Sequence, residues 1–532
     1  MAKKQTKKVD NKLNLESILM NCREYLRSNA TLNDKRDLLL TLVFLRFIGE
    51  KFEDAQIAMR EECIKHGIDN EAVIEAFLNS PARYQNVAYV PEAARWSNLI
   101  NIPAAKLNAA LDDALQAIDD SGEALKGCVR KGLFSSINLE ANVIKKVVDE
   151  VNKISHKVFG EEKDLIGRVY EYFLKSFAVN ATKEDGEFYT PHDIVELIAA
   201  FIEPFDGTLY DPCCGSGGFF LAAQDFITDT NNYNLNREQK EFLKNETFYG
   251  NELVNTTFKM ALMNLYLHNI GDIYGKIPVT KGDSLLSDPG YRVDYVLTNP
   301  PFGKKSSITM TNEEGEEEEE ELVYNRQDFW TTSSNKQLNF IQHINTILKA
   351  TGKAAVVVPD NVLFEGGAGE IIRQKLLHTT DLHTILRLPT GIFYKPGVKA
   401  NVLFYDKKPA SPEMQTKEVW IYDFRTNMHF TLKQHPMTDA DLVDFIECYN
   451  PQNRYERKET WSEENPDGRW RKFSVEEILK RDKTSLDIFW IKDKSLTDLD
   501  SLPNPDVLAA DIIDNLQSAL DGFNELMGML KK

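Results

Sequence analysis

The sequence has few cysteines, and none lies in a pattern that supports a disulfide scaffold or a zinc site. The six cysteines include no Cys-x-x-Cys pair and have no regular spacing, whereas both kinds of structure depend on such spacing. The nine histidines show no pairing at metal-ligand spacing either. We therefore expect that the protein binds no metal ion. We also expect it to lie in a reducing compartment, the cytoplasm.

Long apolar segments are also missing. The most apolar run, residues 38–48, is interrupted by Thr41 and Arg46 and is well short of the ~20 residues that cross a membrane. Lysines make the N-terminus basic, but polar residues follow where a signal peptide needs an apolar stretch. We therefore expect a soluble protein without a targeting signal or a membrane contact.

Positive charge is scarce for a chain of 532 residues. Lys and Arg number 63 against 82 Asp and Glu, which gives a formal charge of −19. Non-specific affinity for DNA comes mainly from Lys and Arg side chains that neutralise phosphates. The excess of negative charge therefore argues against a protein that binds nucleic acid by itself. Apolar residues make up 42% and charged residues 27%, which is ordinary for a globular protein of several domains.

Three zones differ in pattern, and the first, residues 1–160, predicts an all-helical domain. Apolar residues recur there at helical spacing, with one predicted helix near 15–26 and a second at 37–55. Strand-like alternation is absent. The apolar positions of the two helices are Leu15, Ile18, Leu19, Cys22, Leu26, Leu38, Leu42, Leu45 and Ile48.

The second zone, residues 161–473, alternates short β-rich runs with helical stretches. This repeated β-α unit predicts an α/β domain with a doubly wound, mostly parallel sheet. Such sheets bind ligands at the carboxyl ends of their strands. The predicted strands are 208–210, 247–249, 293–298, 354–358, 382–388 and 402–405.

The third zone, residues 474–532, predicts a helical region. After Pro503 and Pro505, apolar residues step by three and four positions, which is a heptad seam of about three repeats. Docking of this helix against a partner is the favoured interpretation, and packing back on its own chain is the alternative. The seam consists of Ala509, Ile512, Leu516, Ala519, Phe523, Leu526 and Leu530.

An acidic run at 313–321 is interrupted only by Gly315. Like charges this dense repel one another, so we expect a solvated loop. A passive loop is the simpler interpretation. The alternative is a segment that repels DNA from a neighbouring pocket.

A glycine-rich turn, Asp211-Pro-Cys-Cys-Gly-Ser-Gly-Gly-Phe219, follows a predicted strand and precedes a helical stretch. Glycines allow a sharp turn and a close approach of ligand to main chain. The turn lacks the Gly-Lys-Ser/Thr of a phosphate-binding loop and the GxGxxG spacing of a dinucleotide site. It predicts a cofactor loop. Its residues of interest are Asp211, Gly215, Ser216, Gly217 and Gly218.

Two acids follow the next two strands. Glu252 ends Tyr249-Gly-Asn-Glu252 and lies 252 − 211 = 41 residues after Asp211. A carboxylate at the end of the second strand of such a fold can accept hydrogen bonds from both ribose hydroxyls. Asp283 follows a further short strand and could face the amino group of an adenine.

The sequence Asn299-Pro-Pro-Phe302 ends the apolar strand 293–298, at the edge where a ligand binds. Pro300 and Pro301 stiffen the turn. The Asn299 side-chain oxygen and the Pro300 carbonyl can then both accept hydrogen bonds from one exocyclic amino group. Phe302 offers an aromatic face on which a planar base can stack.

Together these motifs resemble the methyltransferases that use S-adenosylmethionine to methylate adenine N6 in DNA, and more narrowly the modification subunit of type I restriction–modification systems. The likeness covers nearly the whole chain and implies a Rossmann-like methyltransferase sheet. The other matching segments are Leu-Val-Phe-Leu-Arg-Phe-Ile (42–48), Gly-Glu-Phe-Tyr-Thr-Pro-His (186–192), Val-Val-Pro-Asp-Asn-Val-Leu-Phe (357–364), Leu-Arg-Leu-Pro-Thr-Gly-Ile-Phe (386–393) and Gly-Val-Lys-Ala-Asn-Val-Leu-Phe (397–404).

The resemblance also implies roles for individual residues. Thr190 and Pro191 match positions against the methionine moiety of the cofactor, and His192 stands where Arg is common in the family. Ser216, Gly217 and Gly218 match the loop under the cofactor, Glu252 matches the ribose acid, and Asn299, Pro300 and Phe302 match the target-base site. The upstream segment that covers the cofactor is Glu187, Phe188, Tyr189, Thr190, Pro191 and His192.

By the same resemblance, double-stranded DNA is the substrate, with the target adenine flipped out of the helix. A separate specificity subunit reads the site, two modification subunits join it, and a restriction subunit cuts unmodified DNA. Pro212-Cys213 is similar to the nucleophile of cytosine methyltransferases. Amino methylation needs no covalent adduct, so we interpret Cys213 and Cys214 as packing residues. A methyltransferase for an RNA base or a glutamine side chain, and a non-catalytic assembly subunit, remain as alternatives.

Overall fold

The computed structural model divides the chain into two compact units. The first comprises Met1–Val179, Lys244–Glu246 and Val254–Val279, and the second comprises Asn180–Leu243, Thr247–Leu253 and Thr280–Lys532. The structure describes residues 15–27, 31–84, 87–120, 127–137, 139–154, 190–271, 276–302, 307–311, 317–321, 324–393, 397–431 and 435–494, together with Ala509, Ile512, Ile513, Leu516 and Leu520.

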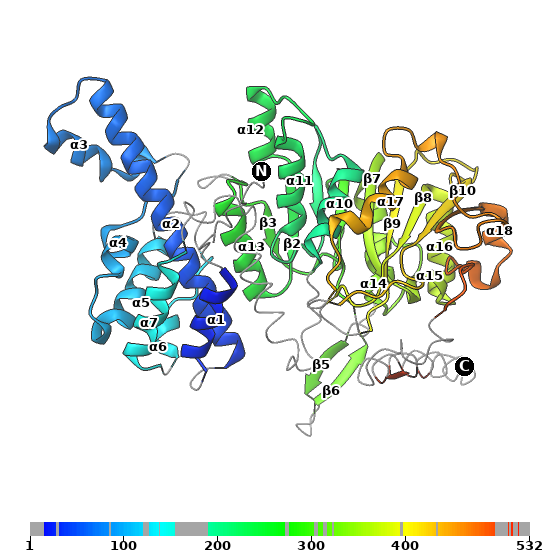
Figure 1. Ribbon diagram of the computed structural model, residues 1–532, viewed down its shortest axis with the longest axis horizontal. Coiled ribbons are helices and arrows are strands. Elements are labelled where there is room, and N and C mark those ends of the chain that lie inside the picture. Colours follow the sequence, from blue (N-terminus) through cyan, green and yellow to red (C-terminus); the bar gives the residue numbers. More distant parts are fainter. Residues whose placement is uncertain are drawn as a thin grey trace, which may run out of the picture. The chain divides into compact units, whose positions relative to one another are not determined.

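The described elements of the first unit are helices, as the sequence predicts (Figure 1). Both predicted amphipathic helices form, and the second is longer than expected, because Thr31 caps its start by accepting from the Asp34 amide and no proline interrupts it. The helices are α1 (Leu15–Tyr25), α2 (Leu32–Lys65), α3 (Glu71–Leu78), α4 (Trp96–Leu99), α5 (Ala104–Asp120), α6 (Leu133–Ser136), α7 (Ala141–Val151) and α13 (Asn255–Leu267), with short 3₁₀ turns at Pro81–Arg83 and Glu92–Ala94.

Helix α13 comes from the middle of the predicted α/β domain, yet it belongs to the helical unit. Lys51 on α2 donates to its terminal carbonyls, Tyr266 O at 3.2 Å and Leu267 O at 2.8 Å. A cation at this end of a helix satisfies carbonyls that have no partner within the helix. Burial lowers the pKa of Lys51 to about 8. The predicted domain boundary at 160 falls outside the described residues and stays a prediction.

The second unit contains a sheet of nine strands in the order β11-β10-β8-β9-β7-β4-β1-β2-β3. Neighbouring strands β1 and β2, β1 and β4, and β4 and β7 run parallel, whereas β9 runs antiparallel to β7 and β8. All six predicted strands form. The strands are β1 (Leu209–Asp211), β2 (Phe248–Glu252), β3 (Val279–Lys281), β4 (Val293–Thr298), β7 (Leu348–Pro359), β8 (Thr380–Arg387), β9 (Ala400–Lys407), β10 (Glu418–Asp423) and β11 (Trp470–Ser474).

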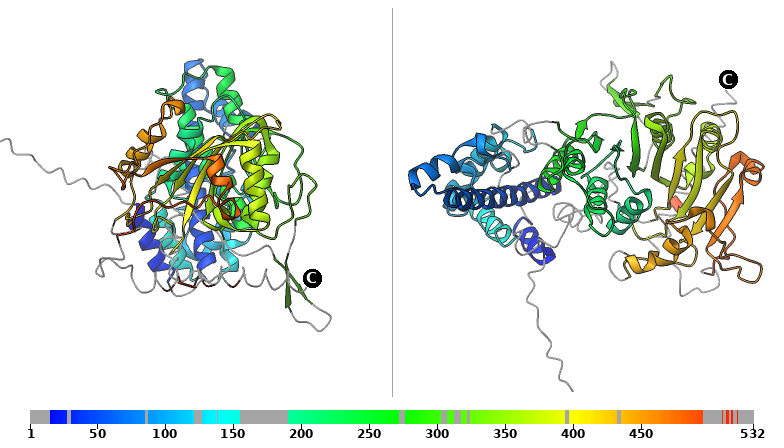
Figure 2. Two further views of the ribbon diagram at one scale, coloured as in Figure 1. Left: turned by 90° about the vertical axis from the view of Figure 1, so that its right-hand side faces the viewer. Right: turned by 90° about the horizontal axis from the view of Figure 1, so that it is seen from above.

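Helices pack on both faces of this sheet, which confirms the doubly wound α/β fold (Figure 2). On one face α10 meets α17 through Phe201, whose ring stacks on Tyr449 at 4.0 Å between centroids. On the other face α14 and α16 bury Ile341 and Leu376 against the strands. The helices are α10 (His192–Ile202), α11 (Gly218–Thr228), α12 (Arg237–Asn245), α14 (Lys336–Ile347), α15 (Asn361–Phe364), α16 (Ala368–Thr379), α17 (Asp439–Tyr449) and α18 (Val475–Leu479).

The acidic run differs from its predicted loop. Residues Glu317–Glu321 form strand β6, which pairs antiparallel with β5 (Ser307–Thr311). The prediction of a loop is therefore wrong over these residues, because their main chain pairs with that of β5. The residues at 312–316 lie outside the described part of the chain.

The third predicted zone is helical only in part. Strand β11 ends at Ser474, α18 and a 3₁₀ turn at Asp482–Thr484 follow, and residues 485–494 have no regular structure. Of the predicted seam, Ala509, Ile512 and Leu516 are helical and exposed. Its positions Ala519, Phe523, Leu526 and Leu530 lie outside the described residues. Within the described part of the chain, no helix combines the length and the apolar character that a membrane crossing requires.

Candidate active site

The glycine-rich turn joins β1 to α11 as predicted. Gly215 and Gly217 have φ of 56° and 86°, in the left-handed region that glycine adopts without steric cost. A Cβ atom built on Gly215 or Gly218 would meet no atom within 4 Å. The turn therefore leaves space directly beside the main chain, where a ligand can approach it closely.

Glu252 lies where the sequence places it, at the end of β2 next to this turn. Its side chain is 7% exposed, and its Oε2 accepts a hydrogen bond from the Gly215 amide at 3.0 Å. The Cys214 amide donates to the Asn251 carbonyl at 2.9 Å. The acid is thus held beside the glycine turn, in a position suited to the hydroxyls of a ribose.

Asp283 follows β3, and the Gly282 amide beside it donates to the Glu252 carbonyl at 3.0 Å. The Asp283 carboxylate accepts from the Tyr324 hydroxyl at 2.7 Å and from the Leu285 amide at 2.9 Å. Tyr324 was not among the predicted site residues, because 41 positions separate it from Asp283 and no local pattern marks it. The structure thereby brings the third predicted acid to the same edge of the sheet.

Asn299 directly follows β4, which lies next to β1, so it lies at this edge as well. Its Nδ2 donates to Thr190 Oγ1 at 2.8 Å, across 109 positions of the sequence. Pro301 carries a carbonyl that accepts from Gln337 Nε2 at 2.9 Å, and Gln337 lies in the first turn of α14. The side chains of Thr190 and Gln337 therefore fix the turn from two sides.

Phe302 is 7% exposed and meets Phe393 edge to face, with 6.0 Å between ring centroids and an interplanar angle of 65°. Phe393 ends the segment 386–393, which the sequence singled out without assigning it a role. Aromatic rings in this arrangement stabilise one another. Phe393 is therefore a residue of the site that the sequence analysis missed.

The glycine turn and the Asn299 turn are directly connected. Thr298 Oγ1 donates to Asp211 Oδ1 at 2.6 Å, and the Cys213 amide donates to the same oxygen at 3.1 Å. Burial raises the pKa of Asp211 to about 7. Burial also raises the pKa of the Cys213 thiol well above its usual range, which favours a packing role over a thiolate nucleophile.

The upstream segment is described only in part. Glu187, Phe188 and Tyr189 lie outside the described residues, whereas Pro191 precedes α10 and His192 begins it. His192 Nε2 lies 3.2 Å from Glu196 Oε1 on the same helix. Of this segment, Thr190 is the residue whose contact with the site is described.

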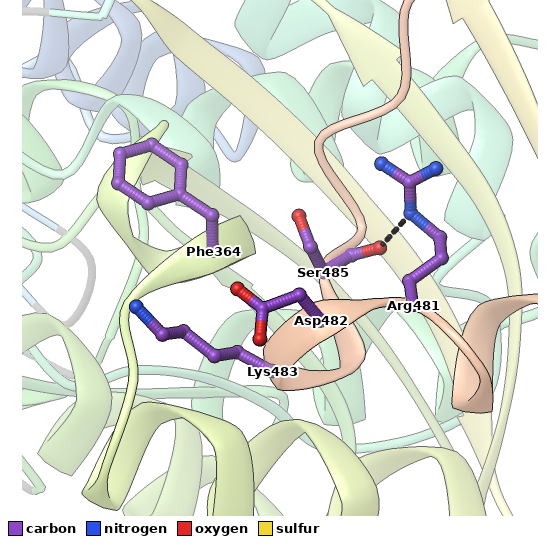
Figure 3. A pocket seen from close by; sticks show the side chains of 5 residues that line it. All are labelled: Phe364, Arg481, Asp482, Lys483 and Ser485. Atoms are coloured by element: carbon purple, nitrogen blue, oxygen red, sulfur yellow. Dashed lines mark hydrogen bonds between the residues drawn. The ribbon is translucent and has the colours of Figure 1, made fainter.

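A separate pocket lies away from these residues and contains none of them. It is lined by Phe364, Arg481, Asp482, Lys483 and Ser485, and Arg481 Nε donates to the Ser485 carbonyl at 2.9 Å (Figure 3).

Among the described residues, no group of three or more His, Cys, Asp and Glu side chains could hold a metal ion.

Comparison with known protein families gives two matches that together span most of the chain. Residues 161–487 match the family described as N-6 DNA Methylase. Residues 15–151 match the HsdM N-terminal domain.

Individual relatives agree with these matches. The chain is 35% identical over 476 residues to the EcoKI methylase subunit of Escherichia coli K12, covering 83% of this chain and 87% of that protein. The alignment with the solved structure of the EcoKI M protein covers 97% of this chain and 96% of that protein, with 30% identity and a TM-score of 0.50. A methyltransferase subunit from Streptococcus thermophilus shares the fold, with a TM-score of 0.64, 22% identity and coverage of 89% and 99%.

These matches cover both the helical unit and the sheet that carries Asp211, Glu252 and Asn299. The relatives matched at 35% identity are methylase subunits of type I restriction enzymes. The chain belongs to the N-6 DNA methylase family, among the methylase subunits of type I restriction enzymes.

Proposed function

We propose that this chain is the modification subunit of a type I restriction–modification complex, and that it transfers a methyl group from S-adenosylmethionine to N6 of adenine in double-stranded DNA. The observation that carries the proposal is the meeting of three motifs at one sheet edge. The glycine turn, Glu252 and Asn299 follow β1, β2 and β4, which are neighbours in the sheet. The end formed by the glycine turn and Glu252 suits a nucleoside, and the end formed by Asn299 suits an amine.

The residues at the ends of β1 and β2 fit the proposed cofactor. The open space beside Gly215 and Gly218 accommodates a ligand against the main chain, and the buried Glu252 carboxylate offers hydrogen-bond acceptors to ribose hydroxyls. Asp283 lies further along the same edge for the adenine amino group. When bound, S-adenosylmethionine supplies an electrophilic sulfonium methyl group, so the reaction needs no metal ion.

The turn at 299–302 holds the target base. An adenine amine inside duplex DNA cannot reach this pocket, so the base leaves the stack. Asn299 Oδ1 and the Pro300 carbonyl accept the two N6 hydrogens, and the Phe302 ring stacks on the purine. This arrangement directs the nitrogen lone pair toward the methyl group. Positioning two reactants in this way supplies most of the acceleration.

Sequence recognition belongs to other subunits. The net charge of −19 gives little electrostatic affinity for DNA, which supports a separate specificity subunit that brings the site to the chain. We propose that two modification subunits and a restriction subunit complete the complex, in the cytoplasm. The seam that begins at Ala509 would dock against helices of the specificity subunit. Truncation after Pro505 should then abolish co-purification with that subunit and leave cofactor binding intact.

A tritium methyl transfer assay tests the proposed reaction. The chain, co-expressed with its specificity subunit, is incubated with labelled S-adenosylmethionine and DNA, RNA or protein acceptors. Label should appear in DNA alone, and digestion to nucleosides should recover it as N6-methyl-2′-deoxyadenosine. Label in RNA or protein, or none in DNA despite cofactor binding, would contradict the proposal.

A further inference from the structure

Thr190 contacts the base-holding residue of the site. The sequence resemblance places this threonine against the methionine end of the cofactor, yet its Oγ1 accepts a hydrogen bond from Asn299 Nδ2 at 2.8 Å. Thr190 is partly buried and lies just before α10, in the same compact unit as Asn299. With the proposed function, this side chain would lie between the two substrates of the reaction.

The orientation of the Asn299 amide decides whether the base can be held productively. An asparagine side chain presents an acceptor on Oδ1 and two donors on Nδ2. The adenine amine must donate its hydrogens, so it needs Oδ1. A rotated amide would place two donors against each other, or donate to the nitrogen lone pair that has to attack. The observed hydrogen bond to Thr190 selects the productive orientation.

A hydroxyl group accepts reliably only when its own hydrogen is used elsewhere, because it can also donate to Oδ1 of a rotated amide. The carboxylate of a methionine moiety is an acceptor without a donor. If it takes the Thr190 hydrogen, only the oxygen lone pairs face Asn299. The amide then has a single favourable orientation, with Nδ2 toward Thr190 and Oδ1 toward the base.

We propose that Thr190 is a positioning residue that orients the Asn299 amide and thereby couples cofactor binding to capture of the target adenine. This inference rests on the proposed function. It predicts that cofactor and target base bind cooperatively, since each favours the same orientation of Asn299. Coupling free energies between two sites are reciprocal and correspond to factors of about 5–150 in affinity.

Two variants of Thr190 test the proposal in the chain assembled with its specificity subunit. T190V removes the hydroxyl and keeps the shape, whereas T190S keeps the hydroxyl. T190V should lower kcat by about 10- to 100-fold, as misplaced catalytic groups do, and T190S should stay within about threefold of wild type. If T190S is as impaired as T190V, the hydroxyl is not the relevant group and the proposal fails.

A binding measurement separates positioning from catalysis. DNA with 2-aminopurine at the target position is titrated with and without S-adenosylhomocysteine, and fluorescence reports the unstacked base. The product analogue should strengthen binding of this DNA to wild type and T190S by a factor within about 5–150, and have no such effect on T190V. Retained coupling in T190V, or loss of cofactor affinity with unchanged behaviour on DNA, would overturn the proposal.

A double-mutant cycle gives a second, independent test. N299D replaces the amide with two equivalent oxygens, so orientation no longer matters. In the N299D background, T190V should therefore lower kcat by less than about threefold, whereas in the wild-type background it should lower kcat by about 10- to 100-fold. An equal cost in both backgrounds would mean that Thr190 acts independently of Asn299. A wild-type complex that binds no cofactor would instead refute the proposed function.

Discussion

The two ends of the site are held by different kinds of interaction. Around the glycine turn, main-chain groups make the defining contacts, such as the Gly215 amide to Glu252. Around Asn299, side chains from distant segments do so, with Thr190 and Gln337 lying 109 and 36 positions away from their partners. The partner of Gly215 also lies far away in the sequence, at 37 positions, so both turns depend on neighbouring strands. They differ in the donor, because the glycine turn contributes a main-chain amide, whereas the contact of Asn299 is lost when either of its two side chains is replaced.

The largest effect that this comparison predicts is on catalysis. Asn299→Ala should lower methyl transfer by orders of magnitude and leave S-adenosylmethionine affinity nearly intact, because the proposed role of Asn299 is to hold the amine and not the cofactor. Single-turnover methylation and calorimetric titration of the cofactor measure the two quantities. A comparable loss of cofactor affinity would mean that the two ends of the site are not separate.

The converse substitution acts on the cofactor end. Glu252→Ala should weaken S-adenosylmethionine binding by about 1.5–3 kcal/mol, the range for hydrogen bonds to a charged group. Glu252→Gln is the matched control, because it keeps an acceptor for the Gly215 amide and should lose less. If Glu252→Gln binds the cofactor as tightly as wild type while Glu252→Ala does not, Glu252 serves only to hold the turn.

A smaller effect is expected from Gln337→Leu, which removes the donor to the Pro301 carbonyl. A buried acceptor that loses its partner costs about 1–3 kcal/mol, and the turn that carries Pro300 and Phe302 becomes less well fixed. We expect kcat to fall about tenfold with unchanged cofactor affinity. Gln374→Leu on α16 is the control. The Gln374 side chain donates to Thr484 and not to the turn at 299–302, so this substitution should leave kcat unchanged.

The smallest effect concerns Asp211, whose burial raises its pKa to about 7 from 3.8. The folded state therefore binds a proton on the Asp211 carboxyl more tightly than the unfolded state does. The stabilisation that this protonation gives the folded state is complete below pH 3.8, and it is lost as the pH rises through about 7. Asp211→Asn should therefore melt above wild type by a margin that grows from pH 5 to pH 8. A margin independent of pH would show that the carboxyl is ionised throughout.

Local patterns were sufficient to predict much of this molecule. Alternating β and helical runs predicted β1, β2, β4, β7, β8 and β9, and the spacing around Gly215 and Asn299 predicted the edge where they meet. The antiparallel direction of β9 fits a connection from β8 whose described residues, 388–393 and 397–399, contain no helix, since parallel neighbours need a long crossover.

Other features depend on contacts that no local pattern records. Thr190, Tyr324 and Phe393 reach the site from segments far from their partners, and sequence spacing cannot show which side chains meet. Strand β6 was misjudged because charge repulsion was weighed without its pairing strand. The assignment of α13 to the helical unit was missed because an apolar helix gives no sign of which surface it covers.

The capping of α13 by Lys51 has a consequence for how such genes can recombine. The helical unit draws on Met1–Val179 and again on Lys244–Glu246 and Val254–Val279, so it is not a module encoded at one end of the gene. A crossover that exchanged only the first segment between relatives would pack α2 against an α13 from the other parent and so change side-chain contacts such as that of Phe44 with Tyr266. Functional chimaeras should therefore carry both segments from the same parent.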